Sequence, residues 1–315
     1  MHRRRWCRRL AGMSPHEHAS GHHHASHDSA DLDWAALASH LEQEAELYAP
    51  LHEQAAAWLR ELLTDPAGDG PDQVRRVLDI GSGPGVISCV LARAFPAAEV
   101  VAVDGSAELL ERAQDRAARL GFGERFRTHL ADLPDGLDAL GGGDVIWSSK
   151  ALHHLGDQRG AVAALAGHLR PGGLLAVCEG GLPSRCLPRD LGLGRPGLQS
   201  RIDAAADEWF STMREALPGF VHETEDWQAF LADAGLRTPA TRSFLLDLPA
   251  PLSDGARAFL VAQLSRGAER WADRFDEEDR TALARLTDPE DAAGIGRRPD
   301  AFLLAAQTVH TARAQ

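Results

Sequence analysis

The sequence predicts an α/β fold with a mainly parallel sheet, followed by helical insertions. The first observation is an apolar segment, residues 77–80, that runs into the glycine-rich turn Gly81-Ser82-Gly83-Pro84-Gly85 and then into a helix-compatible segment. The second is that strand-like and helical segments go on alternating to about residue 180. Such alternation is typical of sheets whose ligands bind at the carboxyl ends of the strands.

The glycine turn favours one class of nucleotide ligand over another. A dinucleotide fingerprint has its third glycine where this chain has Val86, and here the third glycine comes one residue earlier, at Gly85. Asp79 precedes the turn, and its carboxylate would repel a pyrophosphate but attract a ligand with an ammonium group. An oxidoreductase that binds NAD is therefore the weaker interpretation.

Each further core element is indicated by a short apolar segment or by helical spacing. Polar or acidic residues follow the strand-like segments, where a ligand would lie. The predicted elements are a strand over 99–104 that ends at Asp104, a helix over 107–120 before Gly121, a strand over 126–130 followed by Ala131-Asp132-Leu133, a strand over 143–149, a helix over 158–169 and a strand over 174–179 that ends at Glu179.

The pattern D-x-G-x-G-x-G over residues 79–85 resembles the first motif of class I S-adenosylmethionine (SAM) methyltransferases. The resemblance covers roughly residues 75–180 and implies a Rossmann-like seven-stranded sheet whose last strand is antiparallel. It also implies SAM as the cofactor, with Asp104 on the ribose hydroxyls and Asp132 at the adenine amino group. The candidate cofactor-binding residues are Asp79, Gly81, Ser82, Gly83, Gly85, Asp104, Gly105, Ala131, Asp132, Leu133, Ser148 and Tyr48.

Three side chains are candidates for acid–base chemistry. His153 and His154 follow the fourth predicted strand, and histidine can accept a proton near neutral pH. If this segment is helical, only one of the two faces the pocket, and His153 is slightly favoured. Glu179 could orient that base or bind a cationic acceptor. Lys150, the only lysine of the chain, stands beside this segment but is expected to point to solvent.

The remaining segments divide the chain around this core. Residues 1–30 form a basic, His-rich tail that is expected to be disordered; it could begin at Met1 or Met13, and no metal site is predicted in it. Cap helices are expected over 31–64, with a break near Pro50. The predicted SAM-binding core spans 72–180, a cap insertion spans 181–225, and 226–315 completes the sheet with a helical insertion over 249–299. Within these segments, helices are expected over 198–217, 227–234, 251–264 and 276–286, and strands over 243–248 and 302–310.

Composition limits the partners and the compartment. The formal net charge is −13, of which the first 12 residues contribute +5, so the remainder carries −18. This charge disfavours nucleic acid, whose binding depends on phosphate neutralisation. No apolar segment is long enough to cross a bilayer. The four cysteines form neither a metal-ligand spacing nor a disulfide framework, which fits a cytoplasmic protein.

The sequence thus predicts a SAM-dependent methyltransferase that acts on a small molecule, without nucleic-acid or membrane partners and compatible with a homodimer. Two alternatives stay open: a SAM-binding protein without transferase activity, and a protein or nucleic-acid methyltransferase. The acidic body disfavours the nucleic-acid enzyme. So does Trp147-Ser148-Ser149-Lys150, which stands where many base-amino methylases carry an Asn/Asp-Pro-Pro-Tyr motif.

Overall fold

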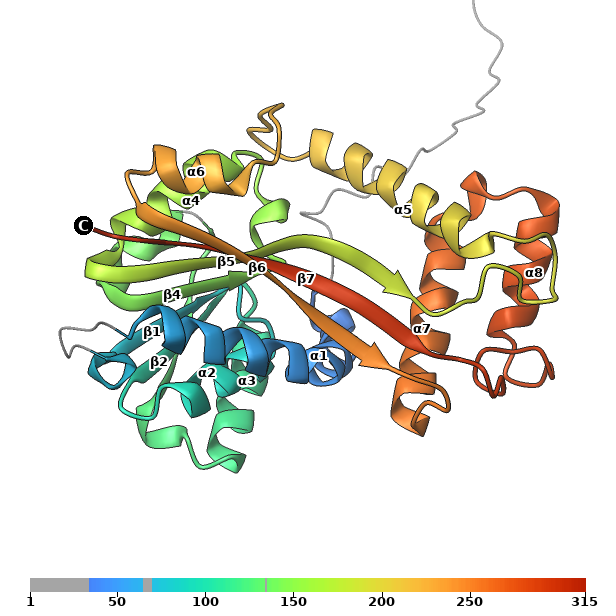
Figure 1. The fold of residues 1–315 in the computed structure, drawn as a ribbon, viewed down its shortest axis with the longest axis horizontal. Coiled ribbons are helices and arrows are strands. Elements are labelled where there is room, and N and C mark those ends of the chain that lie inside the picture. The colour runs from blue at the N-terminus through green and yellow to red at the C-terminus, as the bar shows by residue number, and fades with distance from the viewer. Residues whose placement is uncertain (1–33, 65–69, 134) are drawn as a thin grey trace, which may run out of the picture.

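The computed structural model describes residues 34–64, 70–133 and 135–315, and the predicted tail over 1–30 lies outside them. A seven-stranded sheet has the order β3-β2-β1-β4-β5-β7-β6 (Figure 1). Strands β1 to β5 are parallel, and β7 is antiparallel to its neighbours β5 and β6. This is the sheet that the sequence predicts. The strands are β1 (Arg76–Ile80), β2 (Glu99–Asp104), β3 (Phe126–Leu130), β4 (Gly143–Ser149), β5 (Leu169–Arg185), β6 (Arg237–Leu248) and β7 (Leu303–Arg313).

Helices cover both faces of the parallel part of the sheet. Alternate residues of β1 enter two separate cores, with Val77 on one side and Leu78 on the other. Helices α1, α2 and α3 pack on the first side, and α4 and α6 pack on the second. The helices are α1 (Trp34–Leu62), α2 (Val86–Ala94), α3 (Ala107–Arg119), α4 (Gln158–Gly167), α5 (Leu198–Glu215), α6 (Trp227–Asp233), α7 (Asp254–Arg270) and α8 (Glu277–Thr287).

The prediction of a helix break near Pro50 was wrong. The segment before β1 is a single helix, α1, that continues through Pro50, whereas two helices had been expected. The helix remains continuous because buried residues on either side of the proline, including Tyr48, Leu51 and Leu59, all belong to one core. Tertiary packing of this stripe therefore outweighs the hydrogen bond that proline removes.

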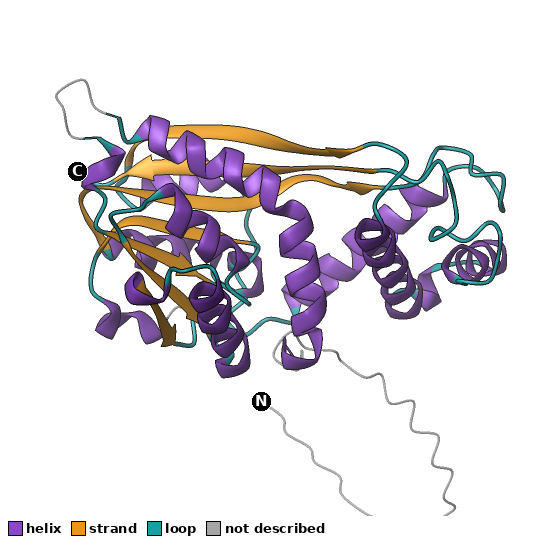
Figure 2. Cartoon of the chain, turned by 90° about the horizontal axis from the view of Figure 1, so that it is seen from below, coloured by secondary structure: helices purple, strands orange, loops and turns teal. Residues whose placement is uncertain are grey.

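Three strands extend well beyond the parallel core. Strand β5 was expected to end at Glu179 but continues to Arg185, and β6 begins at Arg237, six residues before its predicted start. The bulge between Cys178 and Gly181 lets β5 pass the glycines without losing its pairing with β7. Figure 2 shows these long strands running out to the helices at the far end of the molecule.

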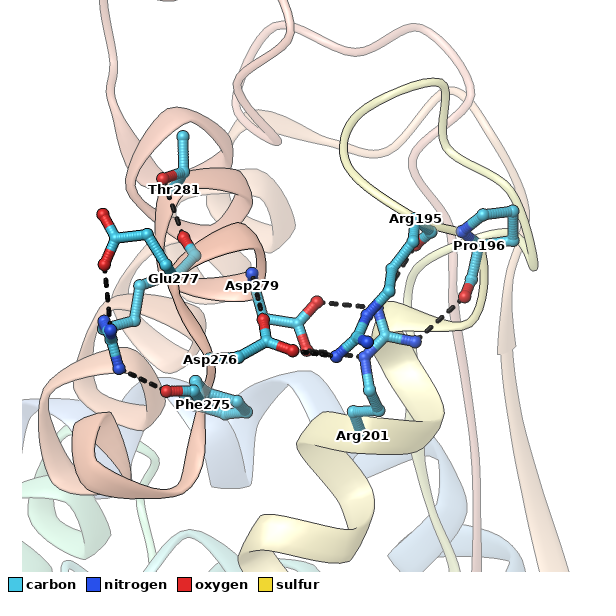
Figure 3. Close-up of polar contacts among 9 residues, drawn as sticks. Arg195, Pro196, Arg201, Phe275, Asp276, Glu277, Asp279 and Thr281 are labelled. Carbon is cyan, nitrogen blue, oxygen red and sulfur yellow. Dashed lines mark hydrogen bonds and ion pairs between the residues drawn. The ribbon is translucent and has the colours of Figure 1, made fainter.

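Helices α5, α7 and α8 form a cap at that end of the long strands (Figure 1). A cluster of charges joins its two segments, which are far apart in sequence (Figure 3). The buried carboxylate of Asp279 on α8 accepts hydrogen bonds from Arg201 at 2.6 and 2.7 Å and from Arg195 at 3.0 Å. The domain boundaries drawn from the sequence stay a prediction, since strands rather than a linker connect core and cap.

No helix in the described part of the chain is both long enough and apolar enough to cross a membrane.

Candidate active site

The glycine turn after β1 forms the floor of the site. Gly81 has a φ of +70°, and a Cβ there would lie 2.3 Å from the Cβ of Ala151. Gly85 has a φ of +74° and begins α2; a Cβ there would lie 2.5 Å from the Cβ of Ala113 on α3. Glycine is required at both positions because the backbone is left-handed and the neighbouring chain is close. Gly85 thus sets the packing of α2 on α3.

Asp104, at the end of β2, is held by the backbone. Its Oδ2 accepts the N–H of Gly83 at 2.8 Å, and its Oδ1 accepts the N–H of Ser106 at 2.9 Å. Burial raises the pKa of this carboxyl, and the N–H donors of Ser106 and Gly83 oppose that rise. The carboxylate therefore stands in a fixed orientation beside the glycine turn.

A cavity of about 420 Å³ extends from this turn to the segment after β4. Its size is that of a small-molecule site. Most of the predicted cofactor residues and both predicted histidines line it: Tyr48, Gly81, Ser82, Gly83, Asp104, Gly105, Ala131, Asp132, Leu133, His153 and His154. The structure therefore brings together residues that are more than 100 positions apart in the sequence.

Four predicted site residues do not line the cavity. Gly85 serves the packing of α2, and Glu179 lies behind His153. Asp79 is buried, and Ser88 on α2 donates a hydrogen bond to it. Burial raises the pKa of Asp79 to about 7. Ser148 is buried inside β4, and its neighbour Ser149 lines the cavity instead, as the alternation of a strand requires.

Glu179 and His153 form a hydrogen-bonded pair at the cavity wall. The Oε1 of Glu179 accepts the N–H groups of Ala151 and Leu152 at 3.0 and 2.9 Å, and its Oε2 lies 2.8 Å from His153 Nδ1. Burial alone would raise the pKa of Glu179, but His153 and the two N–H donors lower it overall. An ionised carboxylate can only accept, so Nδ1 of His153 carries a proton that it donates to Glu179, and in the neutral imidazole Nε2 is the nitrogen with the lone pair.

His154 differs from its neighbour although it lines the same cavity. Burial, with a smaller contribution from His153, lowers the pKa of His154 to about 3. The ring is therefore neutral at physiological pH and a weak base. The 3₁₀ turn over Leu152–His154 holds the two rings 4.2 Å apart.

The side chain of Lys150 is 47% exposed, in keeping with the expectation, but its ammonium is also engaged by α1. Its ammonium donates to Glu44 Oε1 on α1 at 2.7 Å and lies 4.9 Å from the ring centre of Tyr48. Burial alone would lower the pKa of Lys150, but Glu44 and Tyr48 raise it overall. Lys150 has a φ of +52°, unusual for a residue with a side chain. The pair with Glu44 ties α1 to the end of β4.

Two residues of α1, Glu44 and His52, were not among the predicted site residues. With Tyr48 they occur at every fourth position, so they form one face of the helix, and all three line the cavity. Burial lowers the pKa of His52 to about 3. Their spacing on a single helical face was the signal in the sequence. That this face of α1 lines the cavity could not be known without the fold.

Comparison with known proteins identifies the core. Residues 77–173 match the family model described as "Methyltransferase domain". They form a class I SAM-dependent methyltransferase domain.

Curated proteins that are similar to this chain include methyltransferases. A trans-aconitate 2-methyltransferase of Rhodopseudomonas palustris is 35% identical over 166 residues, which are 51% of this chain and 60% of the relative. An uncharacterized methyltransferase of Mycobacterium bovis is 41% identical over 108 residues, 34% of this chain and 52% of the relative. The chain thus spans about half to three fifths of these two relatives, and the match to an uncharacterized Synechococcus protein spans only 24% of that protein.

Similar solved structures include a SAM-dependent methyltransferase from Geobacter sulfurreducens in complex with S-adenosylhomocysteine. It has a TM-score of 0.43 and 21% identity, with 82% of this chain and 90% of that chain covered. A putative sarcosine dimethylglycine methyltransferase from Galdieria sulphuraria has a TM-score of 0.43 and 16% identity, with 82% and 85% covered.

The residues of the methyltransferase domain fit SAM, its cofactor. Asp104 is held in a fixed orientation at the cavity wall, where it would accept hydrogen bonds from ribose hydroxyls, and the carboxylate of Asp132 in the same cavity would accept one from the adenine amino group. At Gly83 a Cβ would meet nothing within 4 Å, so the turn leaves room for a ligand against the backbone.

Proposed function

We propose that this chain transfers the methyl group of SAM to a small-molecule acceptor. The observation that carries the proposal is the single cavity that joins Asp104 and the glycine turn to His153, Lys150 and Tyr48. Bound SAM supplies a methyl group on an activated sulfonium. Helix α1 lies along the cavity with Glu44, Tyr48 and His52, which favours a compact acceptor over a macromolecular one.

In this proposal His153 acts as the base for an oxygen or nitrogen acceptor. Glu179 accepts a hydrogen bond from Nδ1–H of His153. The Nε2 lone pair of the neutral ring is then available for the proton of the acceptor. Glu179 is a positioning residue, since it lies behind the ring and also fixes the backbone of Ala151 and Leu152. The low pKa of His154 makes it a weak base.

The surroundings support further parts of the proposal. The formal charge of −13 opposes a nucleic-acid substrate. The described cysteines, Cys89, Cys178 and Cys186, are free thiols, in keeping with the cytoplasm, where we place the protein.

We extend the proposal to a homodimer. Sedimentation velocity measures whether the protein forms this assembly.

The test combines binding with turnover. Calorimetry measures SAM affinity, and release of S-adenosylhomocysteine measures transfer to a panel of phenols, carboxylic acids and amines. His153→Gln should keep the affinity for SAM but lower kcat by about 10²–10⁴-fold for an oxygen or nitrogen acceptor. The matched control is His222→Gln, since His222 is exposed and does not line the cavity.

Each half of the proposal can fail separately. Absence of SAM binding would contradict the cofactor half. Binding of SAM without transfer to any acceptor would favour a SAM-binding protein without transferase activity. Unchanged turnover in His153→Gln would remove His153 from the chemistry.

A further inference from the structure

Strand β7 carries a glutamine in a row of apolar side chains. Leu303, Ala305 and Val309 lie on the same side of the strand as Gln307, and all three belong to the core that also contains residues of α1. Gln307 is itself only 5% exposed. Burying a polar side chain is unfavourable unless its polar atoms are hydrogen-bonded. An apolar residue would therefore suit the fold better at this position, and the glutamine needs another explanation.

The oxygen end of the Gln307 amide has a partner, whereas the nitrogen end has none. Oε1 accepts a hydrogen bond from the thiol of Cys178 on β5 at 3.5 Å. Burial raises the pKa of this thiol to about 12, so the thiol keeps the proton that it donates. Nε2 has no hydrogen-bond partner in the described part of the chain, although an amide nitrogen carries two N–H donors.

These two donors face the active-site cavity. Some side-chain nitrogens of the described residues are fully enclosed and lack a partner, such as Nε1 of Trp147, but Nε2 of Gln307 is not one of them. It therefore borders open space. Since Gln307 is almost fully buried and lines the cavity of about 420 Å³, that open space is the cavity. The amide nitrogen can thus donate to a ligand that lies there.

The sheet places Gln307 away from the residues that fit SAM (Figure 1). In the order β3-β2-β1-β4-β5-β7-β6, the glycine turn follows β1, and Asp104 ends β2. Neighbouring strands lie about 4.8 Å apart, so β7 is about 14 Å from β1 across the sheet and about 10 Å from β4, whose end leads to His153. Gln307 pairs with Gly181, beyond Cys178 toward the carboxyl end of β5. It therefore belongs to the acceptor end of the cavity.

The charged groups of the cavity do not favour an anionic partner for Gln307. Lys150 is the only lysine of the chain, and its ammonium is paired with Glu44 at 2.7 Å. No arginine of the described residues lines the cavity. Burial is the main cause that lowers the pKa of His52 and of His154, each to about 3, so both rings are neutral. A buried anion without a counter-ion is far more costly than a buried neutral oxygen.

We propose that Gln307 is a specificity-determining residue, whose amide N–H groups donate to an uncharged carbonyl oxygen of the methyl acceptor. This oxygen belongs to a ketone, ester or amide at the end of the acceptor remote from the methylated atom, which His153 serves. A compound without that oxygen leaves Nε2 of Gln307 without a partner and binds more weakly. The inference rests on the proposed methyl transfer where it names the acceptor, but binding of a carbonyl compound at Gln307 does not require transfer.

Three phenols of similar size test the proposal. Of these, 4-hydroxyacetophenone carries an uncharged carbonyl group, 4-isopropylphenol carries none, and 4-hydroxybenzoate carries a carboxylate in the same place. Calorimetry measures the affinity of each for the full-length protein, with and without saturating S-adenosylhomocysteine. The ketone should bind about five- to tenfold more tightly than 4-isopropylphenol, because one hydrogen bond between neutral groups is gained. The carboxylate should bind more weakly than the ketone, because it meets no free counter-ion.

Gln307→Met removes the amide and keeps the approximate size of the side chain. It should abolish the preference for the ketone and leave the affinities for 4-isopropylphenol and SAM unchanged. In protein labelled with ¹⁵N at glutamine, the ketone should shift the side-chain amide signals that Gln307→Met identifies by their loss. The urea midpoint of Gln307→Met should not fall, because an apolar side chain suits the row of Leu303, Ala305 and Val309.

Gln199→Met is the matched control. Gln199 on α5 is also buried but does not line the active-site cavity. Both ends of its amide are engaged, since it donates to Asp203 at 2.9 Å and accepts the N–H of Cys186 at 3.1 Å. Its replacement should lower the urea midpoint and leave the ranking of the three phenols unchanged. If Gln307→Met fails to fold, the ranking in the wild-type protein still decides, since it needs no variant.

Several results would overturn the proposal. These are no binding of the ketone up to its solubility limit, equal affinity for the ketone and 4-isopropylphenol, tighter binding of 4-hydroxybenzoate, or ketone binding that Gln307→Met leaves unaltered. Weaker SAM binding in Gln307→Met would also overturn it, since the amide would then serve the cofactor. If the phenols rank as expected but no acceptor is methylated, the carbonyl site stands and the proposed methyl transfer falls, so the two proposals fail in different ways.

Discussion

Three acidic side chains on strands β1, β2 and β5 have pKa values that are shifted differently. Burial raises the pKa of Asp79 to about 7, with a hydrogen bond from Ser88 opposing it. Burial also raises the pKa of Asp104, but backbone N–H groups oppose this rise because they stabilise the charged carboxylate. The pKa of Glu179 is lowered, because the effects of His153 and of two N–H donors outweigh the effect of burial. The balance between burial, which raises each pKa, and the hydrogen bonds and the charge of His153, which lower it, decides the direction of each shift.

The raised pKa of Asp79 predicts a pH-dependent loss of stability. The folded protein keeps this proton up to about pH 7, whereas the unfolded chain releases it around the ordinary value of 3.8. Wild-type stability relative to Asp79→Asn should therefore fall as pH rises from about 4 to 7, and stay level above 7. The fall should be up to about 4 kcal/mol, since each pKa unit is worth about 1.4 kcal/mol.

Urea unfolding of both proteins at intervals between pH 4 and 8.5 measures this difference. Because the other titrating groups are common to both proteins, the difference isolates Asp79. Asp115→Asn, an exposed position on α3, is the matched control and should show no trend. A constant difference between wild type and Asp79→Asn across this range would contradict the buried, protonated carboxyl.

At the scale of elements, α1 connects the cofactor region to the cap. Glu42 pairs with Arg116 of α3 at 2.6 Å, Glu44 pairs with Lys150 after β4, and the ring of His40 stacks on Phe259 of α7 at 5.2 Å. These contacts all come from the half of the helix before Pro50. All α1 residues that line the cavity except His52 come from this half, and the later half is anchored in the core by Leu51 and Leu59.

Pro50 should therefore weaken α1 without breaking it. A proline inside a helix removes the hydrogen bond to the carbonyl four residues earlier, at a cost of about 3 kcal/mol. Pro50 is exposed, so Pro50→Ala should restore that bond without disturbing the core, and raise the free energy of unfolding by roughly 1–3 kcal/mol. Urea denaturation measures it. The control Gln54→Ala, exposed on the next turn, should change it by less than about 0.5 kcal/mol; a loss of stability in Pro50→Ala would show that the proline is required.

The parallel core could be predicted from the sequence because its signals are local. The strands that end at Asp104, Leu130 and Ser149 have the predicted bounds, since each is a short segment closed by polar or turn residues. Continuity of α1 through Pro50 and of β5 through Gly180 could not be predicted, because distant packing partners decide both.

Only the part of the site that has local signals in the sequence could be predicted. Gly81, Gly83 and Asp104 follow from a motif, but choosing Ser149 rather than Ser148 requires the phase of β4 against its neighbours. Glu44 reaches Lys150 from 106 positions away. No spacing in the sequence reports such a contact.

On the scale of the whole molecule, one sheet runs through both the core and the cap. Strand β5 pairs with β4 through Ser149–Cys178 and with β7 as far as Arg185–Leu304. The core and the cap therefore share backbone hydrogen bonds along the same strands. This continuity argues that the cap is not an independently folding insertion, and that strain in the cap reaches the core.

A change deep in the cap should accordingly lower the stability of the entire chain. Asp279→Ala removes the buried carboxylate that Arg201 and Arg195 share, and leaves Arg201 without its carboxylate while Arg195 keeps Asp276. The expected loss is roughly 2–4 kcal/mol, below the upper range for buried pairs because the arginines are partly exposed. Native-state hydrogen exchange under increasing denaturant should show amides of β1 and α8 losing equal free energy, as one cooperative unit requires. Glu290→Ala removes an exposed ion pair with Arg297 and should leave the protection of the β1 amides and of the α8 amides unchanged. Loss of protection confined to α8 would instead show that the cap unfolds by itself despite the shared strands.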